Sequence, residues 1–352
     1  LMAVTQAQVA QLYVALFNRA PEGAGFNAWV AAGANKTQAQ LAQLMLESPA
    51  ALAYYGNTID TDKGYIETIY KNILGKDYSQ DPNGIDSWVL HLQLGHSRGE
   101  TLVKLFEVAT SALAKAADPV AAKIFENKTA LSAYMAEKIP NIQTDSLGNY
   151  DYAIFQEIIR TTTATNFDEQ KAKIDALASA TVHTLTNGAE TLTGSAGVDI
   201  YSAVASSFAD RNTLSVEDKI DGGAGNDMLN VKIDDSFTGF TTGYVKNVEA
   251  LNLANTSNTQ RVFNADKVEG LQSVSTHGTN GIRVTNLSNI VDLTVIDQKD
   301  STEVGIAYNT ELVKGKNDSQ NLTLNNVGRA TPDTENDSHK NSLKVKFNGI
   351  ET

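Results

Sequence analysis

Residues 218–230 read DKIDGGAGNDMLN, and from residue 222 onward this stretch fits the pattern G-G-x-G-x-D-x-U-x at every constrained position. Glycines let the backbone turn tightly and aim its carbonyl groups inward, because they tolerate positive φ angles. Asp227 adds a charged oxygen, and Leu229 begins a short apolar strand. Oxygen ligands on a flexible loop suit calcium. The stretch therefore predicts a calcium site.

A nine-residue spacing extends this pattern toward the N-terminus. Asp218 precedes Asp227 by nine residues, and Ile220 precedes Leu229 by the same interval. We interpret the interval as one turn of a repeating structure, which puts a carboxylate and an apolar residue in the same two places on successive turns.

A weaker copy lies upstream, where residues 194–201 read GSAGVDIY and lack the second glycine. Glu190 precedes Asp199 by nine residues, as in the first copy. An Asp- and Gly-rich turn between strands would explain the glycines of both copies, but it would not explain the spaced carboxylates. The candidate calcium ligands are Glu190, Gly197, Asp199, Asp218, Asp221, Gly223, Gly225, Asn226 and Asp227.

The composition limits the kinds of partner. The chain of 352 residues has 28 Lys and Arg against 41 Asp and Glu, a formal net charge of −13. Proteins that bind duplex nucleic acid normally show the opposite balance, so we expect no nucleic-acid partner. An acidic module loses its self-repulsion when it binds a divalent cation. The chain has no cysteine, so if the protein is extracellular, calcium is a candidate for the stabilising role that disulfides have in many secreted proteins.

No apolar run reaches the length needed to span a bilayer, and the first residues do not resemble a secretory signal. If the chain is exported, its signal must lie elsewhere. The sequence ends shortly after the strand-like segment 343–347, so we expect the strand-rich region to continue beyond residue 352.

The chain changes character near residue 180. Before it, apolar residues recur at helical spacing; after it, short segments such as 231–233, 251–253 and 293–295 alternate apolar and polar residues. These patterns predict an α+β protein with separate domains. Residues 1–180 would form an all-α helical repeat domain, and residues 181–352 a calcium-binding β-roll or β-solenoid, truncated at its C-terminal end.

The helical half contains an internal repeat, at residues 11–56 and 68–110. Tyr13 aligns with Tyr70, and Trp29 aligns with Trp88. Each unit is predicted to contain a helix, a Gly-containing loop, a Trp helix, a turn and a further helix. The tryptophans have two interpretations, as core residues or as a glycan-stacking surface. Further helices are expected at 119–139 and 150–179, with breaks at Pro140 and Gly148.

The helical repeat has the pattern L-Y-x-x-x-L-x-R-x-P-x-x-x-G-x-x-x-W at residues 12–29, and the copy at 69–88 has Lys76 in place of Arg19. This pattern resembles a bacterial domain of unknown function that is often attached to secreted calcium-binding repeat proteins. Similar sequences also occur in phycobilisome linkers, so the helical half alone does not fix a function.

The second half resembles RTX-type surface-layer proteins. Its glycine-rich nonapeptide is followed by residues 245–253, VKNVEALNL, which is similar to the N-V-E-x-L-N-L strand of that family. The order of the two halves is similar to that of surface-layer proteins of the Campylobacter and Caulobacter type.

The resemblance implies a structural protein of the bacterial cell surface, exported by type I secretion. In that family the N-terminal region anchors the layer to lipopolysaccharide, and the remainder self-associates into a calcium-dependent lattice. The residues that would meet acidic sugars are Tyr13, Arg19, Trp29, Tyr70, Lys71, Lys76 and Trp88. The alternative is that these basic residues belong to ordinary solvated faces.

No catalytic constellation is visible, so an enzyme is not expected. The sequence has no G-x-S-x-G elbow, no H-E-x-x-H motif and no phosphate loop. Two alternatives to the surface-layer hypothesis remain: a secreted RTX-type adhesin, and an RTX enzyme whose catalytic region lies beyond residue 352.

Overall fold

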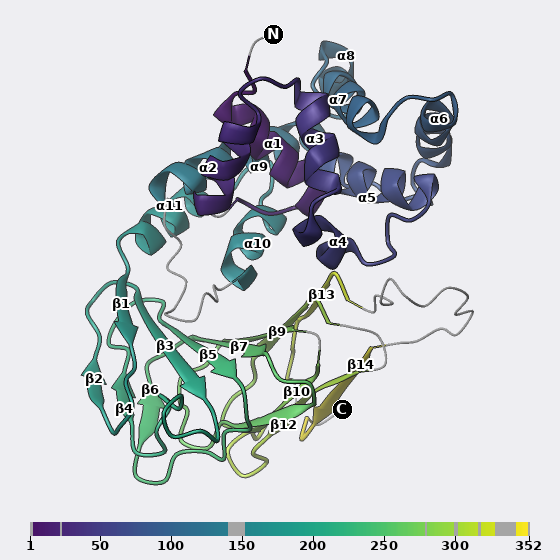
Figure 1. Ribbon diagram of the computed structural model, residues 1–352. Coiled ribbons are helices and arrows are strands. Elements are labelled where there is room, and N and C mark those ends of the chain that lie inside the picture. The colour runs from purple at the N-terminus through teal and green to yellow at the C-terminus, as the bar shows by residue number, and fades with distance from the viewer. Residues whose placement is uncertain are drawn as a thin grey trace. The chain divides into compact units, whose positions relative to one another are not determined.

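The computed structural model describes residues 3–21, 23–139, 152–278, 280–298, 302–315, 318–327 and 343–350. The chain divides into two compact units, a helical unit whose last residue is Ala178 and a strand-rich unit formed mainly by the residues from Ser179 onward. Figure 1 shows the helices in purple to blue-teal and the strands in green to yellow. The expected helix breaks at Pro140 and Gly148 lie outside the described residues.

The helical unit opens with two successive sets of four helices. The first set is α1 (Gln6–Phe17), α2 (Gly23–Ala32), α3 (Gln38–Leu46) and α4 (Pro49–Tyr55). The second set is α5 (Asp62–Leu74), α6 (Pro82–Gln93), α7 (Arg98–Ala109) and α8 (Ala112–Ala117). Three helices follow, α9 (Pro119–Lys138), α10 (Tyr152–Arg160) and α11 (Phe167–Ala178). The first three helices of each set correspond to the repeat seen in the sequence, whereas the fourth, α4 or α8, was not predicted.

Equivalent helices of the two sets begin with the same local chemistry. Thr37 and Ser97 each form a capping box, in which the hydroxyl accepts a backbone N–H and the residue three positions later reaches back to the cap. The helices that they begin, α3 and α7, pack closely together. Gly99 makes this approach possible, because a Cβ at this position would lie 2.1 Å from the carbonyl oxygen of Ala39.

The core of the helical unit forms around α1. Leu12 and Leu16 on α1 and Ile66 and Ile69 on α5 are fully buried, and α1 packs against both α5 and α9. Each such side chain contributes about 1.5–3 kcal/mol through burial. The helical unit thus has the apolar interior that its periodicity predicts.

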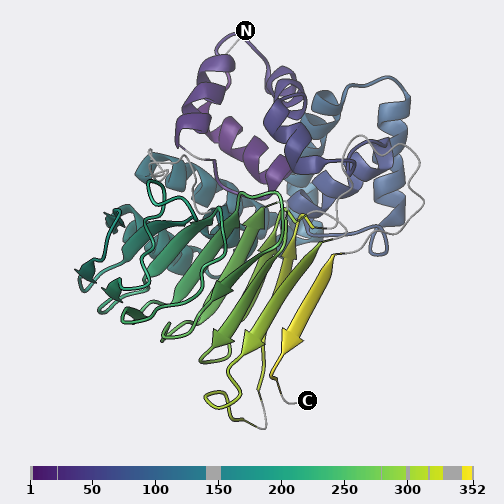
Figure 2. The ribbon, with the colours of Figure 1, turned by 60° about the horizontal axis from the view of Figure 1, so that its bottom comes forward.

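The strand-rich unit consists of parallel strands in three sheets (Figure 2). Sheet A contains seven strands in the order β1 (Thr181–Thr184), β3 (Asp199–Ala205), β5 (Met228–Ile233), β7 (Ala250–Asn255), β9 (Ser273–Gly278), β11 (Asp292–Ile296) and β13 (Leu322–Asn325). Sheet B contains β2 (Thr191–Thr193), β4 (Lys219–Asp221) and β6 (Tyr244–Lys246). Sheet C contains β8 (Arg261–Asn264), β10 (Ile282–Leu287), β12 (Glu303–Tyr308) and β14 (Lys344–Asn348).

Each pass of the chain, here called a coil, adds one strand to sheet A and one to a second sheet. The second sheet is B up to β6 and C from β8 onward. In-register pairing stacks apolar side chains into a column, in which Leu229 lies beside Leu251, Leu251 beside Val274 and Val274 beside Leu293. All four are buried. This arrangement is compatible with a β-solenoid.

The coils differ in length. Thr181 pairs with Asp199, so the first coil is as long as two nonapeptides. Ile200 pairs with Met228, so the second coil is longer than the first. The longer coil accommodates a loop at residues 206–215, between β3 and β4. The second coil is therefore longer than the first where this loop lies.

Candidate metal centre

The predicted calcium ligands lie where the chain enters its strands. Glu190 and Asp218 immediately precede β2 and β4, which are neighbours in sheet B. Asp199 opens β3 and Asp227 immediately precedes β5, which are neighbours in sheet A. The nine residues between two carboxylates therefore lead from one sheet to the other.

The interpretation of nine residues as a full turn is wrong. Thr191 pairs with Lys219 and Ile200 pairs with Met228, so stacked positions in these coils are separated by much more than one nonapeptide. Both strands of one coil bury alternate apolar residues, so the same sequence pattern recurs at each strand. The nine-residue interval therefore spans half of the first coil and does not measure a full turn. The carboxylates brought together are thus Glu190 with Asp218 and Asp199 with Asp227.

Asp218 is fully buried and binds the backbone of two segments. Its Oδ1 accepts the N–H of Glu190 at 2.8 Å, and its Oδ2 accepts the N–H of Ser215 at 2.7 Å. Burial raises the pKa of this carboxyl, although the two N–H groups oppose part of the effect. Asp218 therefore connects two neighbouring coils through these two hydrogen bonds.

Asp199 is also fully buried, and both of its oxygens have partners. Oδ1 lies 2.7 Å from Nε2 of His183, and Oδ2 accepts the N–H and the hydroxyl of Ser195 at 2.7 and 2.8 Å. Burial alone would raise the pKa of Asp199, but the hydrogen bonds from His183 and Ser195 together outweigh it and lower the pKa. The carboxylate is the stable form here.

Asp227 differs from these two carboxylates. Its Oδ1 accepts the N–H of Asp199 at 2.8 Å, and its own N–H donates to Oε2 of Glu249 at 2.8 Å. Its Oδ2 is buried and has no hydrogen-bond partner among the described residues. Burial raises the pKa of Asp227, and the charge of Glu249 adds to the effect. A buried carboxylate oxygen without a partner is costly unless a cation neutralises it.

The glycine loop beside Asp227 stacks directly on the loop of the preceding coil. A Cβ on Gly222 would lie 2.7 Å from the orphan Oδ2 of Asp227. Gly223 and Gly225 have φ angles of 90° and 145°, and a Cβ there would lie 2.5 Å from the carbonyl oxygen of Ser195 and 2.3 Å from that of Gly197. Only glycine permits this approach, so backbone carbonyl oxygens lie against the loop that carries Asp227.

The remaining predicted ligands are engaged or exposed. Asp221 pairs with Lys246 at 3.0 Å and accepts the side-chain amide of Asn247 at 2.7 Å, and these two contacts lower its pKa. Glu190 accepts the N–H of Thr186 at 2.8 Å. Asn226 is exposed.

An oxygen-preferring cation is therefore compatible with one part of the predicted set. The orphan Oδ2 of Asp227 and the carbonyl oxygens of the two glycine loops have the donor chemistry that calcium requires. The oxygens of Asp199, Asp218 and Asp221 already accept hydrogen bonds. Within the ranges that the structure describes, no three His, Cys, Asp or Glu side chains gather into a group that could hold a metal ion.

Two residues of this corner were not among the predicted ligands. Glu249 accepts the N–H of Asp227, and the ring of His183 binds Asp199 and stacks on Tyr201 with ring centroids 4.7 Å apart. The interpretation of segment 245–253 as one strand is wrong, because β6 ends at Lys246, β7 begins at Ala250, and Glu249 lies in the connection between them. Its role was missed because the interval from Asp227 to Glu249 is not a multiple of nine.

The residues predicted to meet sugars occupy different environments in the helical unit. Tyr13 and Tyr70 are buried, and the hydroxyl of Tyr70 donates to Oδ2 of Asp81 at 2.5 Å. Trp29 and Trp88 are partly buried against the apolar core.

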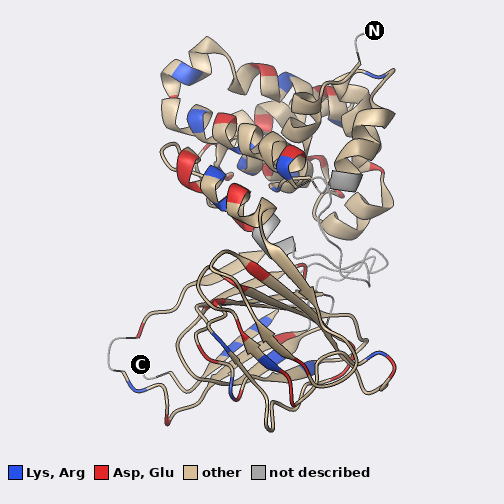
Figure 3. Cartoon of the chain, turned by 90° about the vertical axis from the view of Figure 1, so that its left-hand side faces the viewer, with Lys and Arg blue, Asp and Glu red and all other residues tan. Residues whose placement is uncertain are grey.

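The predicted basic residues have partners nearby. The guanidinium of Arg19 lies 5.7 Å from the ring centre of Tyr13. Lys71 lies 3.9 Å from Asp77, and Lys76 lies 3.3 Å from Asp118. Figure 3 shows acidic and basic residues interspersed along the helices. The two tryptophans and the basic residues are the members of the set with exposed surface.

One family matches part of the chain. Residues 42–111 match the family described as a domain of unknown function (DUF4214). This match begins within α3, continues through α7 and so includes the second copy of the helical repeat. No curated protein and no solved structure matches the chain. Among the described helices, none combines the length and the apolar character needed to cross a membrane.

Proposed function

We propose that this chain is part of a secreted structural protein of the bacterial cell surface. Its strand-rich unit would be a solenoid that folds on calcium, and its helical unit would hold the layer at lipopolysaccharide. The observation that supports the calcium part best is the orphan Oδ2 of Asp227, buried beside a glycine loop whose pattern is typical of calcium-binding repeats.

The physical argument concerns charge. Asp199, Asp218 and Asp227 are fully buried carboxylates in a chain whose formal charge is −13. Hydrogen bonds satisfy the first two, but Asp227 also faces the carboxylate of Glu249, which binds its N–H. A bound calcium ion would supply positive charge at this corner. Asp227 and the carbonyl oxygen of Gly197 would hold it, together with the carbonyl oxygen of Ser195, which accepts the N–H of Ala224 at 3.3 Å and has a second lone pair.

The calcium concentration would then determine where the strand-rich unit folds. Extracellular calcium modules bind the ion with a Kd of roughly 10⁻⁴–10⁻³ M, which cytosolic calcium does not reach. The strand-rich unit would stay loose in the cell and fold after export, because binding free energy becomes folding free energy. This behaviour suits export through a channel that passes unfolded chain.

The anchoring role of the helical unit rests on the resemblance of its repeat and on its partly exposed aromatic and basic residues. Trp29 and Trp88 would provide stacking faces, and Lys71 and Lys76 would meet acidic sugars after exchanging their present carboxylate partners. Surface ion pairs of this kind are worth about 0–1 kcal/mol, so the exchange costs little.

Calorimetric titration of the full chain with calcium tests the first part. We expect saturable binding that Asp227→Ala weakens, because the variant lacks the orphan oxygen. Asp266→Asn is the matched control, since Asp266 is an exposed carboxylate of the same unit. Unchanged affinity in Asp227→Ala, or no binding at millimolar calcium, would overturn the calcium proposal.

Cosedimentation of the full chain with lipopolysaccharide tests the second part. Smooth and rough lipopolysaccharide, each with calcium and with chelator, would separate O-antigen from core-sugar recognition. We expect Lys71→Gln combined with Lys76→Gln to weaken binding, and Lys104→Gln, an exposed lysine paired with Glu107 at 2.7 Å, to leave it unchanged. Absence of binding to both preparations would remove the anchoring role.

A further inference from the structure

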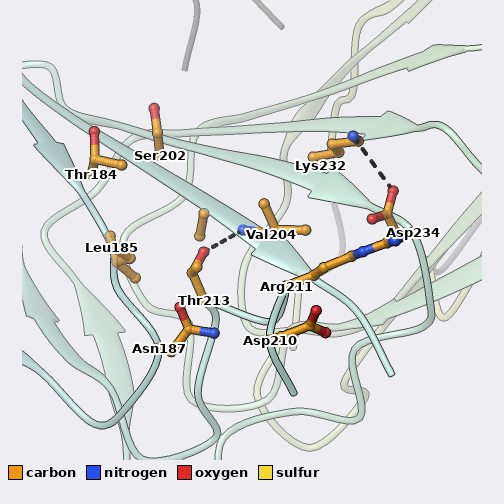
Figure 4. Close-up of a pocket in the computed structure, with 11 residues that line it drawn as sticks. Thr184, Leu185, Asn187, Ser202, Val204, Asp210, Arg211, Thr213, Lys232 and Asp234 are labelled. Carbon is orange, nitrogen blue, oxygen red and sulfur yellow. Dashed lines mark hydrogen bonds and ion pairs between the residues drawn. The ribbon is translucent and has the colours of Figure 1, made fainter. Parts of the chain in front are cut away.

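A cavity of about 400 Å³ lies beside β1, β3 and β5, on the strand-rich unit (Figure 4). Polar and apolar atoms share its lining, and the polar residues include Thr184, Ser202, Asp210, Arg211, Lys232 and Asp234. Thr184 pairs with Ser202 across neighbouring strands, which places two hydroxyl groups side by side. Cavities of this volume fall within the usual range of small-ligand sites.

The wall of this cavity comes from the loop at residues 206–215, which accompanies the expansion from the first coil to the longer second coil. Hydrogen bonds to Val204 hold the loop on its own coil. The N–H groups of Thr213 and Leu214 both donate to the carbonyl oxygen of Val204 at 2.9 Å. The N–H of Val204 donates to the hydroxyl of Thr213 at 2.8 Å.

The loop is also tied to the preceding coil. The side-chain amide of Asn187 donates to the carbonyl of Ala209 at 2.7 Å. Within the loop, the N–H groups of Arg211 and Asn212 both donate to the carbonyl of Phe208 at 2.9 Å. These bonds make the wall a defined structure that presents Asp210 and Arg211 at the cavity.

The charges at the cavity are only partly paired. Lys232 lies 3.8 Å from Asp234, so these two largely neutralise each other. The guanidinium of Arg211 lies 5.2 Å from the ring centre of Phe208, an exposed aromatic that orients it. Among the described residues, Arg211 has no ion pair. Asp210 has no ion pair among them either, so one cation and one carboxylate are available to a ligand, next to hydroxyl and amide groups.

We propose that this cavity binds a saccharide that carries a carboxylate group, such as a uronic acid. The ligand carboxylate would pair with Arg211, whose planar guanidinium suits bidentate contact. Sugar hydroxyls would donate to Asp210 and Asp234, and would exchange hydrogen bonds with Thr184 and Ser202. The site does not depend on the proposed function, because its residues belong neither to the glycine loops nor to the helical unit.

The lining disfavours two other ligand classes. A polyphosphate or nucleic acid would bring several negative charges against Asp210 and Asp234, and the chain as a whole carries −13. An apolar ligand would bury Thr184, Ser202 and the charged pair without hydrogen bonds, which is costly. A polyhydroxylated acid satisfies both the cation and the hydroxyl groups.

Titration of the full chain by ligand-observed NMR and calorimetry tests this inference, in calcium-containing buffer, with galacturonate, galactose and acetate as probes. We expect saturable binding of galacturonate at millimolar concentration, weaker binding of galactose and none of acetate. Arg211→Gln should weaken galacturonate binding roughly tenfold, the usual effect of losing one charge-assisted hydrogen-bonding pair.

Arg283→Gln is the matched control, because Arg283 is an exposed arginine of sheet C that also has no ion pair among the described residues. It should leave the affinity unchanged. Circular dichroism of each variant checks that the fold is retained. The inference is overturned if galacturonate does not bind, if galactose binds equally well, or if Arg211→Gln and wild type bind alike. None of these results depends on whether calcium stabilises the strand-rich unit.

Discussion

The helical unit buries mainly apolar side chains, whereas the strand-rich unit buries carboxylates as well as apolar side chains. The helical unit closes around apolar residues such as Leu12, Leu16 and Ile69, and its helix ends are satisfied by Thr and Ser caps. The strand-rich unit also has an apolar column, but it buries the carboxylates of Asp199, Asp218 and Asp227 at its corners. An apolar core needs no cofactor, whereas buried negative charge needs donors or a cation.

Solvent conditions should therefore act differently on the two units. Both tryptophans, Trp29 and Trp88, belong to the helical unit, so intrinsic tryptophan fluorescence reports that unit alone. Far-ultraviolet circular dichroism reports both. The two signals together separate the response of one unit from that of the other.

Removal of calcium should give the largest difference. We expect chelation to abolish the unfolding transition of the strand-rich unit and to leave the fluorescence transition unchanged. Calcium at 100 times its Kd would stabilise the folded unit by about 2.7 kcal/mol per site. Thermal scans with calcium, with magnesium and with chelator measure this. Identical scans in all three conditions would contradict the proposed metal dependence.

Raising the pH should stabilise only the helical unit, through Lys128. This side chain is 9% exposed, its Nζ donates to Oδ1 of Asn18 at 3.0 Å, and burial, with the charge of Arg160, lowers its pKa to about 8. An unfolded lysine has a pKa of about 10.4. Between pH 8 and pH 10 the unfolded chain therefore holds a proton that the folded chain has lost, so the free energy of unfolding rises with pH, by up to about 3 kcal/mol.

Urea unfolding followed by fluorescence at several pH values measures this effect, and Lys128→Met should flatten the profile. The rise should end above pH 10, because burial raises the pKa of Tyr55 and of Tyr65. Their unfolded forms lose a proton that the folded forms keep, which reverses the slope. A wild-type profile that is flat from pH 8 to pH 10 would show that Lys128 is not desolvated.

Gly99→Val should destabilise the helical unit by about 1–3 kcal/mol, since the added side chain meets the backbone of α3. The fluorescence midpoint in urea should fall, with the calcium-dependent transition unchanged. Gly75→Ala is the control, because Gly75 has a φ of 69° but no atom within 4 Å of an added Cβ, and it should cost about 1 kcal/mol. A smaller loss in Gly99→Val than in Gly75→Ala would argue against the close packing of α3 on α7.

Asp227→Asn should give the smallest change in stability, but the direction of this change should reverse between buffers with and without calcium. In chelator, where the wild-type unit is expected to be unfolded, the variant removes an uncompensated buried charge, so we expect it to regain part of the folded strand signal, an effect of about 1 kcal/mol. In calcium it removes a ligand, so we expect it to destabilise the same unit. Circular dichroism melts in the two buffers measure the change of sign. A shift of equal sign and size in both buffers would mean that Asp227 meets no cation.

Much of the architecture could be predicted from residue patterns. The helical repeat appears as two sets of four helices, and segments 231–233, 251–253 and 293–295 lie within β5, β7 and β11. These elements depend on local periodicity, which the sequence displays directly. The change of partner sheet from B to C at β8 could not be predicted, because it depends on how successive coils stack.

The candidate site divides in the same way. Asp218 and Asp227 could be selected because a carboxylate beside a glycine loop is a local signal. One oxygen of Asp227 has no partner among the described residues, whereas both oxygens of Asp199 and of Asp218 have partners. This difference depends on residues that lie far away in the sequence. Glu249 and the cavity beside Arg211 were missed for the same reason.

By itself, the sequence determined the order of the two units, the type of secondary structure in each and the positions where only glycine can turn, because these follow from neighbouring residues. The tertiary structure decided which residues stack, which carboxylates are satisfied and where an expanded coil opens a cavity. Those properties arise between residues that lie a full coil apart, where the length of each loop sets the register.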